Sequence, residues 1–141
     1  MSSFLTGMEI SSSGLAAQRT RMNIVSSNLA NARTTRTQQG GPYRRLQPVF
    51  EAGQAQESFA GHLNRSIRTV QVAGIEQDPR PFQEVYDPGH PDANALGYVQ
   101  MPNVNIMEEM VSMITATRSY EANATAFESL KNMANRAINI G

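Results

Sequence analysis

The chain has 141 residues with 12 basic and 12 acidic side chains, so no general charge draws it to nucleic acid or to anionic lipid. It has no cysteine, which excludes disulfides and cysteine metal sites, and no apolar run reaches the roughly 18 to 20 residues that span a bilayer. We therefore expect one ordinary domain, or two small pieces sharing a core, without direct membrane insertion.

The N-terminal segment, residues 1–35, is predicted to form a long helix. It contains no proline, and its apolar residues recur at steps of three and four, with serine and glutamine at two skipped positions. Gly7, Gly14 and the serine run 11–13 weaken this helix, each glycine by about 1 kcal/mol. Such a helix is expected to need partner helices that bury its apolar stripe, which comprises Phe4, Met8, Leu15, Met22, Val25 and Leu29.

The stretch SSNLANARTT, residues 26–35, places Asn28 and Asn31 three positions apart on one side of this helix. Asn is a poor helix former and is costly to bury without partners. One interpretation is that the two amides donate and accept across contacts between like helices, fixing their register. The alternative is that they end the helix, with Asn31 near its C-terminal cap.

The middle segment, residues 36–102, holds all seven prolines and is predicted to be a β-rich domain with loops. PYRRLQPVFEA (42–52) and IRTVQVAGI (67–75) are predicted strands, and a brief third strand is expected at Tyr98 and Val99. We interpret residues 52–64 as a flexible loop or linker.

Two groups in the middle segment could carry chemistry. Asp87, His90 and Asp92 could hold a divalent ion, but the intervening prolines and glycine favour turns in which aspartate bonds its own backbone. No catalytic motif is present, so we expect no enzymatic activity, cofactor or metal; a metal-dependent enzyme centred on these three residues is the alternative. The basic run Arg33, Arg36, Arg44 and Arg45 is expected to face solvent or a partner's acidic side chains rather than nucleic acid.

The C-terminal segment, residues 103–141, is predicted to form the second long helix, roughly 50 Å in length. Asn105 and Glu108 resemble a capping pair at its start, and two apolar stripes run along it. More than one apolar face fits contacts with several neighbours. Four polar residues are expected at the edges of these contacts: Glu108, Glu109, Arg118 and Glu121.

The resulting fold class is α+β, mainly α, elongated, with residues 1–35 and 103–141 forming a discontinuous helical assembly domain. The predicted subunit interface combines the apolar stripes with the polar residues spaced along them. Its members are Leu15, Met22, Val25, Asn28, Leu29, Asn31, Ile106, Met110, Met113, Ile114, Tyr120, Asn123, Phe127 and Leu130.

Two terminal stretches, SSGLAAQRTRMNIVSSNLANARTT and PNVNIMEEMVSMITATRSYEANATAFESLKNMANRAINIG, resemble the paired terminal signatures of bacterial flagellar axial proteins. The rod and hook families share both. The stretch VYDPGHPDANALGYVQMPNVN narrows the resemblance to the proximal rod proteins of the basal body. The resemblance covers nearly the whole chain.

The resemblance implies a non-enzymatic building block of the proximal rod, a helical drive shaft that transmits torque from the motor to the hook. It also implies export through the flagellar type III apparatus without signal cleavage and assembly in the periplasm; the N-terminus indeed lacks the basic region of a cleaved signal. Implied partners are copies of itself, the other proximal rod protein, the distal rod protein and the protein at the junction of MS ring and rod. Another rod-type axial protein, or a soluble helical adaptor, is the alternative.

Overall fold

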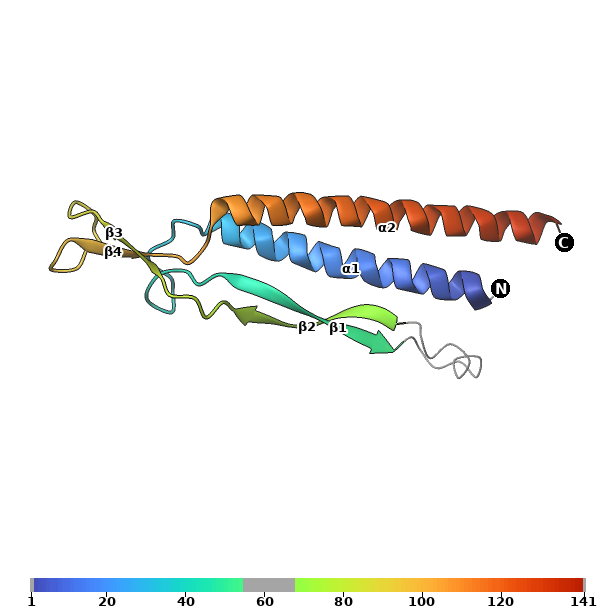
Figure 1. Ribbon diagram of the computed structural model, residues 1–141, viewed down its shortest axis with the longest axis horizontal. Coiled ribbons are helices and arrows are strands. Elements are labelled where there is room, and N and C mark those ends of the chain that lie inside the picture. Colours follow the sequence, from blue (N-terminus) through green and yellow to red (C-terminus); the bar gives the residue numbers. More distant parts are fainter. Residues whose placement is uncertain (1, 55–67, 141) are drawn as a thin grey trace.

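The computed structural model describes residues 2–54 and 68–140 and confirms an α+β, mainly helical fold. Two long helices lie side by side, and two antiparallel strand pairs occupy the intervening segment (Figure 1). In chain order the elements are α1 (Ser2–Ala30), β1 (Leu46–Gln54), β2 (Arg68–Gln77), β3 (Gln83–Tyr86), β4 (Tyr98–Met101) and α2 (Ile106–Ile140).

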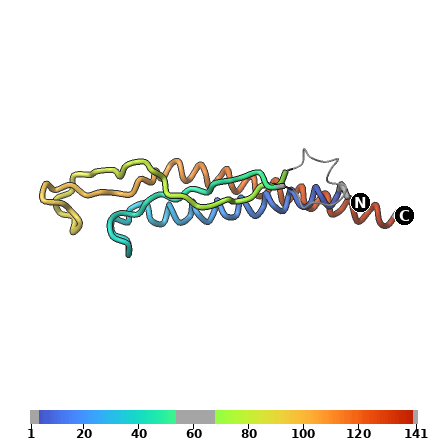
Figure 2. Tube along the Cα trace, turned by 90° about the horizontal axis from the view of Figure 1, so that it is seen from below, coloured from blue at the N-terminus to red at the C-terminus, as the bar shows by residue number. Residues whose placement is uncertain are grey.

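The two helices run antiparallel, so the N- and C-terminal ends of the chain lie at the same end of an elongated molecule (Figures 1 and 2). At the opposite end α1 passes into the segment that leads to β1, and β4 leads into α2. Asn105 caps α2, since its side-chain oxygen accepts hydrogen bonds from the backbone N–H groups of Met107 (3.0 Å) and Glu108 (3.4 Å). The predicted cap of the second helix is therefore confirmed.

The ribbon of β1 and β2 lies along α1 rather than apart from it (Figure 1). The strands pair from Leu46 with Gln77 to Gln54 with Arg68, and the register shifts between Val49 and Phe50. On the helix side, the Ser13 hydroxyl accepts a hydrogen bond from the backbone N–H of Val70 at 3.2 Å. Helix α1 thus packs against the ribbon as well as against α2.

The pair of β3 and β4 extends beyond the helices at the end opposite the termini (Figures 1 and 2). Strand β4 was expected from the sequence, but β3 was not, because its side chains are all exposed and give no alternating pattern. Tyr86 and Tyr98 face each other across the pair with ring centroids 5.2 Å apart. Gly97 has φ +81, and a Cβ there would lie 2.9 Å from the Tyr86 ring, so this turn requires glycine.

The loop between β3 and β4 has the turn geometry expected of its aspartates. The Asp87 carboxylate accepts from the backbone N–H of Gly89 at 3.2 Å, and His90 Nδ1 accepts from that of Asp92 at 3.1 Å. Asp92 in turn accepts from the Thr35 hydroxyl at 2.8 Å. Across residues 2–54 and 68–140 no group of three acidic or histidine side chains is arranged to hold a metal ion.

Part of the predicted 52–64 loop is strand, since β1 continues to Gln54, and the remainder lies outside the described residues. The division of the chain into a helical domain and a domain at residues 36–102 stays a prediction.

Candidate subunit interface

Helices α1 and α2 meet along a seam in which glycine allows close approach. A Cβ at Gly14 would lie 2.8 Å from the Asn123 side-chain nitrogen, and one at Gly7 would lie 3.1 Å from a methyl carbon of Leu130. Ser11, buried, lies between the two glycines on the same helical face. The two glycines that weaken the helix by propensity are therefore the residues that bring its partner near.

The residues at the centre of the seam, Gly7 and Gly14, each precede a residue of the apolar stripe predicted on α1, Met8 and Leu15 respectively. Leu15, Met22 and Leu29 are half-buried beside the seam, while Val25 is buried. The shift has a steric cause: small residues at the centre of a contact let the backbones approach, and the bulky side chains then fill its flanks.

The structure separates the predicted interface residues of α2 into two faces. Five lie half-buried on the side toward α1, namely Met113, Tyr120, Asn123, Phe127 and Leu130. The other three, Ile106, Met110 and Ile114, are exposed. Together with exposed Met107 and Val111 they form a continuous apolar strip at steps of three and four, which we call the outer stripe: Ile106, Met107, Met110, Val111 and Ile114.

The five side chains of the outer stripe are all exposed in the single chain, from 42% at Ile106 to 68% at Met107. They cluster over the first turns of α2, and such exposed apolar patches mark interaction sites on soluble proteins. No described helix combines the length and apolarity that crossing a membrane demands. The stripe is thus the strongest candidate for a contact with another protein.

A cluster of buried, hydrogen-bonded polar side chains, which we call the junction, lies on the side of α2 away from the outer stripe. Glu109 is 0% exposed and accepts from Arg45 Nε at 2.6 Å with one oxygen and from Asn28 Nδ2 at 3.0 Å with the other. Arg45 also donates to the Asp78 carboxylate at 3.1 Å. These charged groups are paired and hydrogen-bonded, as burial of charge requires.

Asp78 extends the junction toward the strand pairs. The hydrogen bond from the Arg80 side chain holds the pKa of Asp78 at about 2, below its ordinary 3.8, although burial opposes the shift. The same contact raises the pKa of Arg80. Asn103 links the same residues through their backbones. Its side-chain oxygen accepts a hydrogen bond from the Arg45 backbone N–H at 2.8 Å, and its side-chain nitrogen donates to the Asp78 and Arg80 carbonyls. Two carboxylates thus balance two guanidinium groups.

Asn28 joins this junction to the start of β1. Its carboxamide donates to the Leu46 carbonyl at 2.8 Å and accepts from the Leu46 N–H at 3.0 Å, and it also accepts from the Tyr43 hydroxyl at 2.9 Å. The Asn28 side chain is 1% exposed, and its amide groups bond residues of its own chain. Its place in a subunit interface stays a prediction.

Asn31 follows the alternative interpretation. Helix α1 ends at Ala30, and the Asn31 side chain donates to the Ser27 carbonyl at 2.9 Å and accepts from the Thr34 hydroxyl at 3.2 Å. These local bonds satisfy groups at the helix end, so the helix-ending role of Asn31 is confirmed.

Two further expectations need correction. Glu109 lies inside the chain instead of at the edge of a subunit contact, and Arg45 pairs with its own chain instead of facing solvent or a partner. Arg44 likewise turns inward, with its guanidinium 4.3 Å from the centre of the Phe82 ring. The ion pair of Arg45 with Glu109 was not predicted, because the two residues lie 64 positions apart and no sequence periodicity connects them.

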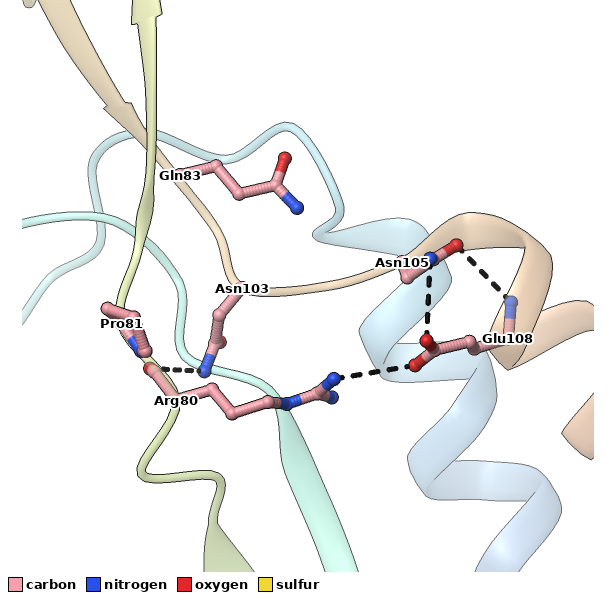
Figure 3. Close-up of a pocket in the computed structure, with 6 residues that line it drawn as sticks. All are labelled: Arg80, Pro81, Gln83, Asn103, Asn105 and Glu108. Atoms are coloured by element: carbon pink, nitrogen blue, oxygen red, sulfur yellow. Dashed lines mark hydrogen bonds and ion pairs between the residues drawn. The ribbon is translucent and has the colours of Figure 1, made fainter.

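An open recess of about 230 Å³ lies next to the junction, at the start of α2 (Figure 3). The Arg80 guanidinium extends toward the Glu108 carboxylate, with nitrogen and oxygen 3.6 Å apart, and the Asn103 side-chain nitrogen donates to the Arg80 carbonyl at 3.0 Å. The charged groups that line the recess, Arg80 and Glu108, pair with one another. The ion pair of Arg80 with Glu108 thus joins the segment before β3 to the start of α2.

Known families match the two ends of the chain that form the helix pair. The family model described as flagella basal body rod protein matches residues 8–37, and that described as flagellar basal body rod FlgEFG protein C-terminal matches residues 95–140. The first covers most of α1, and the second covers β4 and α2.

Similar proteins extend across the whole chain. The flagellar basal-body rod protein FlgC of Bacillus subtilis is 46% identical over 145 aligned residues, covering 95% of this chain and 95% of its own. FlgC of Borreliella burgdorferi is 43% identical over 96% of this chain and 95% of its own. FlgC of Salmonella typhimurium is 40% identical over 94% of each. The chain therefore belongs to the FlgC family of flagellar basal-body rod proteins.

Proposed function

We propose that this chain is a structural subunit of the basal-body rod, and that the outer stripe of α2 is a surface it buries against neighbouring subunits. The exposed apolar side chains of this stripe carry the proposal, since water contact with such a patch is unfavourable and burial against a partner removes it. The junction at Glu109 supports it, because it fixes the start of α2 relative to α1 and β1.

We also propose the place of the chain within the rod, its partners and its route of export. The chain occupies the proximal rod, contacts copies of itself, the other proximal rod protein, the distal rod protein and the MS-ring junction protein, and helps transmit torque. It reaches the periplasm through the flagellar type III export apparatus without signal cleavage. Residues 1–35 and 103–141 act as the assembly domain, and residues 36–102 form the β-rich domain outside it. Family membership supports each of these proposals.

We propose no catalytic role. The described acidic and basic side chains of the recess and the junction pair with one another: Arg45, Asp78, Arg80, Glu108 and Glu109.

Two genetic tests address the proposal. Deleting the gene should abolish rod completion and motility, and normal swimming without it would refute the rod assignment. Ile114→Asp should abolish rod assembly, since a charge in the outer stripe cannot be buried unpaired. Ile114→Leu is the matched control and should assemble normally.

The Ile114→Asp subunit should retain wild-type thermal stability, because this side chain is exposed in the free chain. Wild-type rod numbers with Ile114→Asp would show that the outer stripe is not an assembly surface. Analytical ultracentrifugation of the wild-type chain should find mostly monomer; a discrete stable oligomer would favour a soluble adaptor instead.

A further inference from the structure

The chain has eight methionines and no cysteine, so methionine is its only sulfur-containing residue type. No thiol in the chain competes for an oxidant, so oxygen-transfer oxidants that react with sulfur meet methionine thioethers alone. Which methionines are exposed then decides what oxidation does to the protein.

Exposure differs between the two methionines of the outer stripe and the two that lie beside the seam. Met107 is 68% exposed and Met110 is 48% exposed, and both belong to the outer stripe. Met22 and Met113 are half-buried beside the seam, and the Met22 sulfur accepts a hydrogen bond from the Thr117 hydroxyl at 3.6 Å. Among the described residues three methionines are exposed. Two of them, Met107 and Met110, lie on the candidate assembly surface, and the third, Met133 at 48%, lies farther along α2.

We propose that Met107 and Met110 form an oxidation-sensitive site that controls whether the free subunit can assemble. The proposal rests on the proposed function, since it takes the outer stripe as the assembly surface. The oxidant is hydrogen peroxide. Its outer oxygen bonds to the thioether sulfur as the O–O bond breaks; the sulfur is oxidised by two electrons, and the remaining oxygen leaves as water.

The product is a methionine sulfoxide, whose S–O group is a strong hydrogen-bond acceptor in place of an apolar sulfur. Met107 and Met110 lie three positions apart, so their side chains are neighbours on α2 and two such acceptors would stand together. An apolar partner surface leaves these acceptors unsatisfied, and docking fails. A sulfoxide reductase with a dithiol reverses the change, releasing water and forming a disulfide on the reductant.

The first experiment measures oxidation rates. The purified full chain and isolated basal bodies are exposed to dilute hydrogen peroxide, and added oxygen is located by peptide mass spectrometry. In the free chain Met107 and Met110 should oxidise several times faster than Met22 and Met113, and in basal bodies this difference should disappear through protection. Equal rates at all four in the free chain would overturn the proposal, as would unprotected Met107 and Met110 in basal bodies.

The second experiment asks whether oxidation at these two sites matters for assembly. Cells carry either the wild-type chain or the double variant Met107→Leu, Met110→Leu as the sole copy, and new basal bodies are counted after a peroxide pulse. Leucine keeps the apolar volume but cannot be oxidised, so the variant should assemble normally without peroxide. After the pulse, the wild type should form several times fewer rods than the variant.

Equal loss of rods in both strains would overturn the oxidation site while leaving the rod assignment intact. Normal rods in cells that lack the gene altogether would instead refute the proposed function. Incubation of oxidised wild-type chain with sulfoxide reductase and dithiothreitol should return both methionines to the thioether; failure to restore them would remove the reversible control that we propose.

Discussion

The two ends of the helix pair are held together by different physical means. Where α1 ends and α2 begins, a fully buried carboxylate binds a guanidinium and an amide, Glu109 with Arg45 and Asn28. Toward the chain termini the same helices touch through glycines, at Gly7 and Gly14. Hydrogen bonds between the helices are directional and tolerate little sliding of one helix along the other. Contacts at glycine allow the helices to approach closely but do not fix their relative position. The comparison teaches that register is set at the junction and that the terminal half follows it.

The comparison also predicts where the subunit is least stable. Residues 121–139 of α2 are exposed or half-buried. Segments with few buried contacts open at low free-energy cost. We expect the terminal half to gain its remaining order from neighbouring subunits, with binding offsetting the entropy of ordering.

The largest expected effect comes from breaking the junction. Glu109→Gln removes a buried charge and leaves the Arg45 guanidinium partly uncompensated, so chemical denaturation should show a loss of about 3 to 5 kcal/mol in unfolding free energy. Glu108→Gln, next to it but exposed, should cost less than about 1 kcal/mol. Similar losses for the two variants would mean that the buried pair does not dominate this end.

Asn28→Leu sharpens the same comparison through an uncharged group. It strands the Leu46 backbone groups and one Glu109 oxygen, and each buried polar atom left unpaired costs about 1 to 3 kcal/mol. Asn31→Leu is the control, because its amide bonds only nearby groups, and it should cost about 1 kcal/mol or less. Urea unfolding that ranks the two variants the other way would contradict an internal role for Asn28.

The terminal half is probed by Gly14. Gly14→Leu should force the helices apart and cost about 1 to 3 kcal/mol. Gly14→Ala should be nearly neutral, because helix propensity improves by about 1 kcal/mol while the flexible end of Asn123 must move aside. Calorimetric melting of both variants checks this, and a Gly14→Leu chain as stable as the wild type would show that no close contact exists there.

The smallest effect is the acid response of the junction. The folded-state pKa of Asp78 is depressed to about 2 from 3.8, so the folded state binds this proton less tightly than the unfolded state. The stabilisation is present above about pH 4 and is lost as the pH falls through 2. Asp78→Asn should therefore flatten the pH dependence of unfolding between these values. An unchanged dependence would show that Asp78 is not the titrating group.

Much of the architecture could be predicted from the sequence. The proline-free ends of the chain predicted both helices, and Asn105 predicted the start of α2. Alternating apolar and polar residues predicted the strands of the ribbon. These features are local, and each depends on the chemistry of a few neighbouring residues.

The seam and the junction could not be predicted in the same way. The seam is centred on glycines that a search for apolar stripes passes over, and the junction joins Asn28, Arg45 and Glu109 from three distant segments. The outer stripe was correctly recognised as apolar, but the sequence did not separate it from the face that α1 covers, because both faces carry large side chains. Only the packing of α1 on α2 distinguishes them.

A cryo-EM map of the intact basal body, with this chain traced, tests the central claim most directly. We predict that helices of neighbouring subunits cover Ile106, Met110 and Ile114, while Asn28 remains bonded to Glu109 of its own chain. A map in which the outer stripe faces solvent, or in which Asn28 reaches across to a neighbouring subunit, would contradict the account.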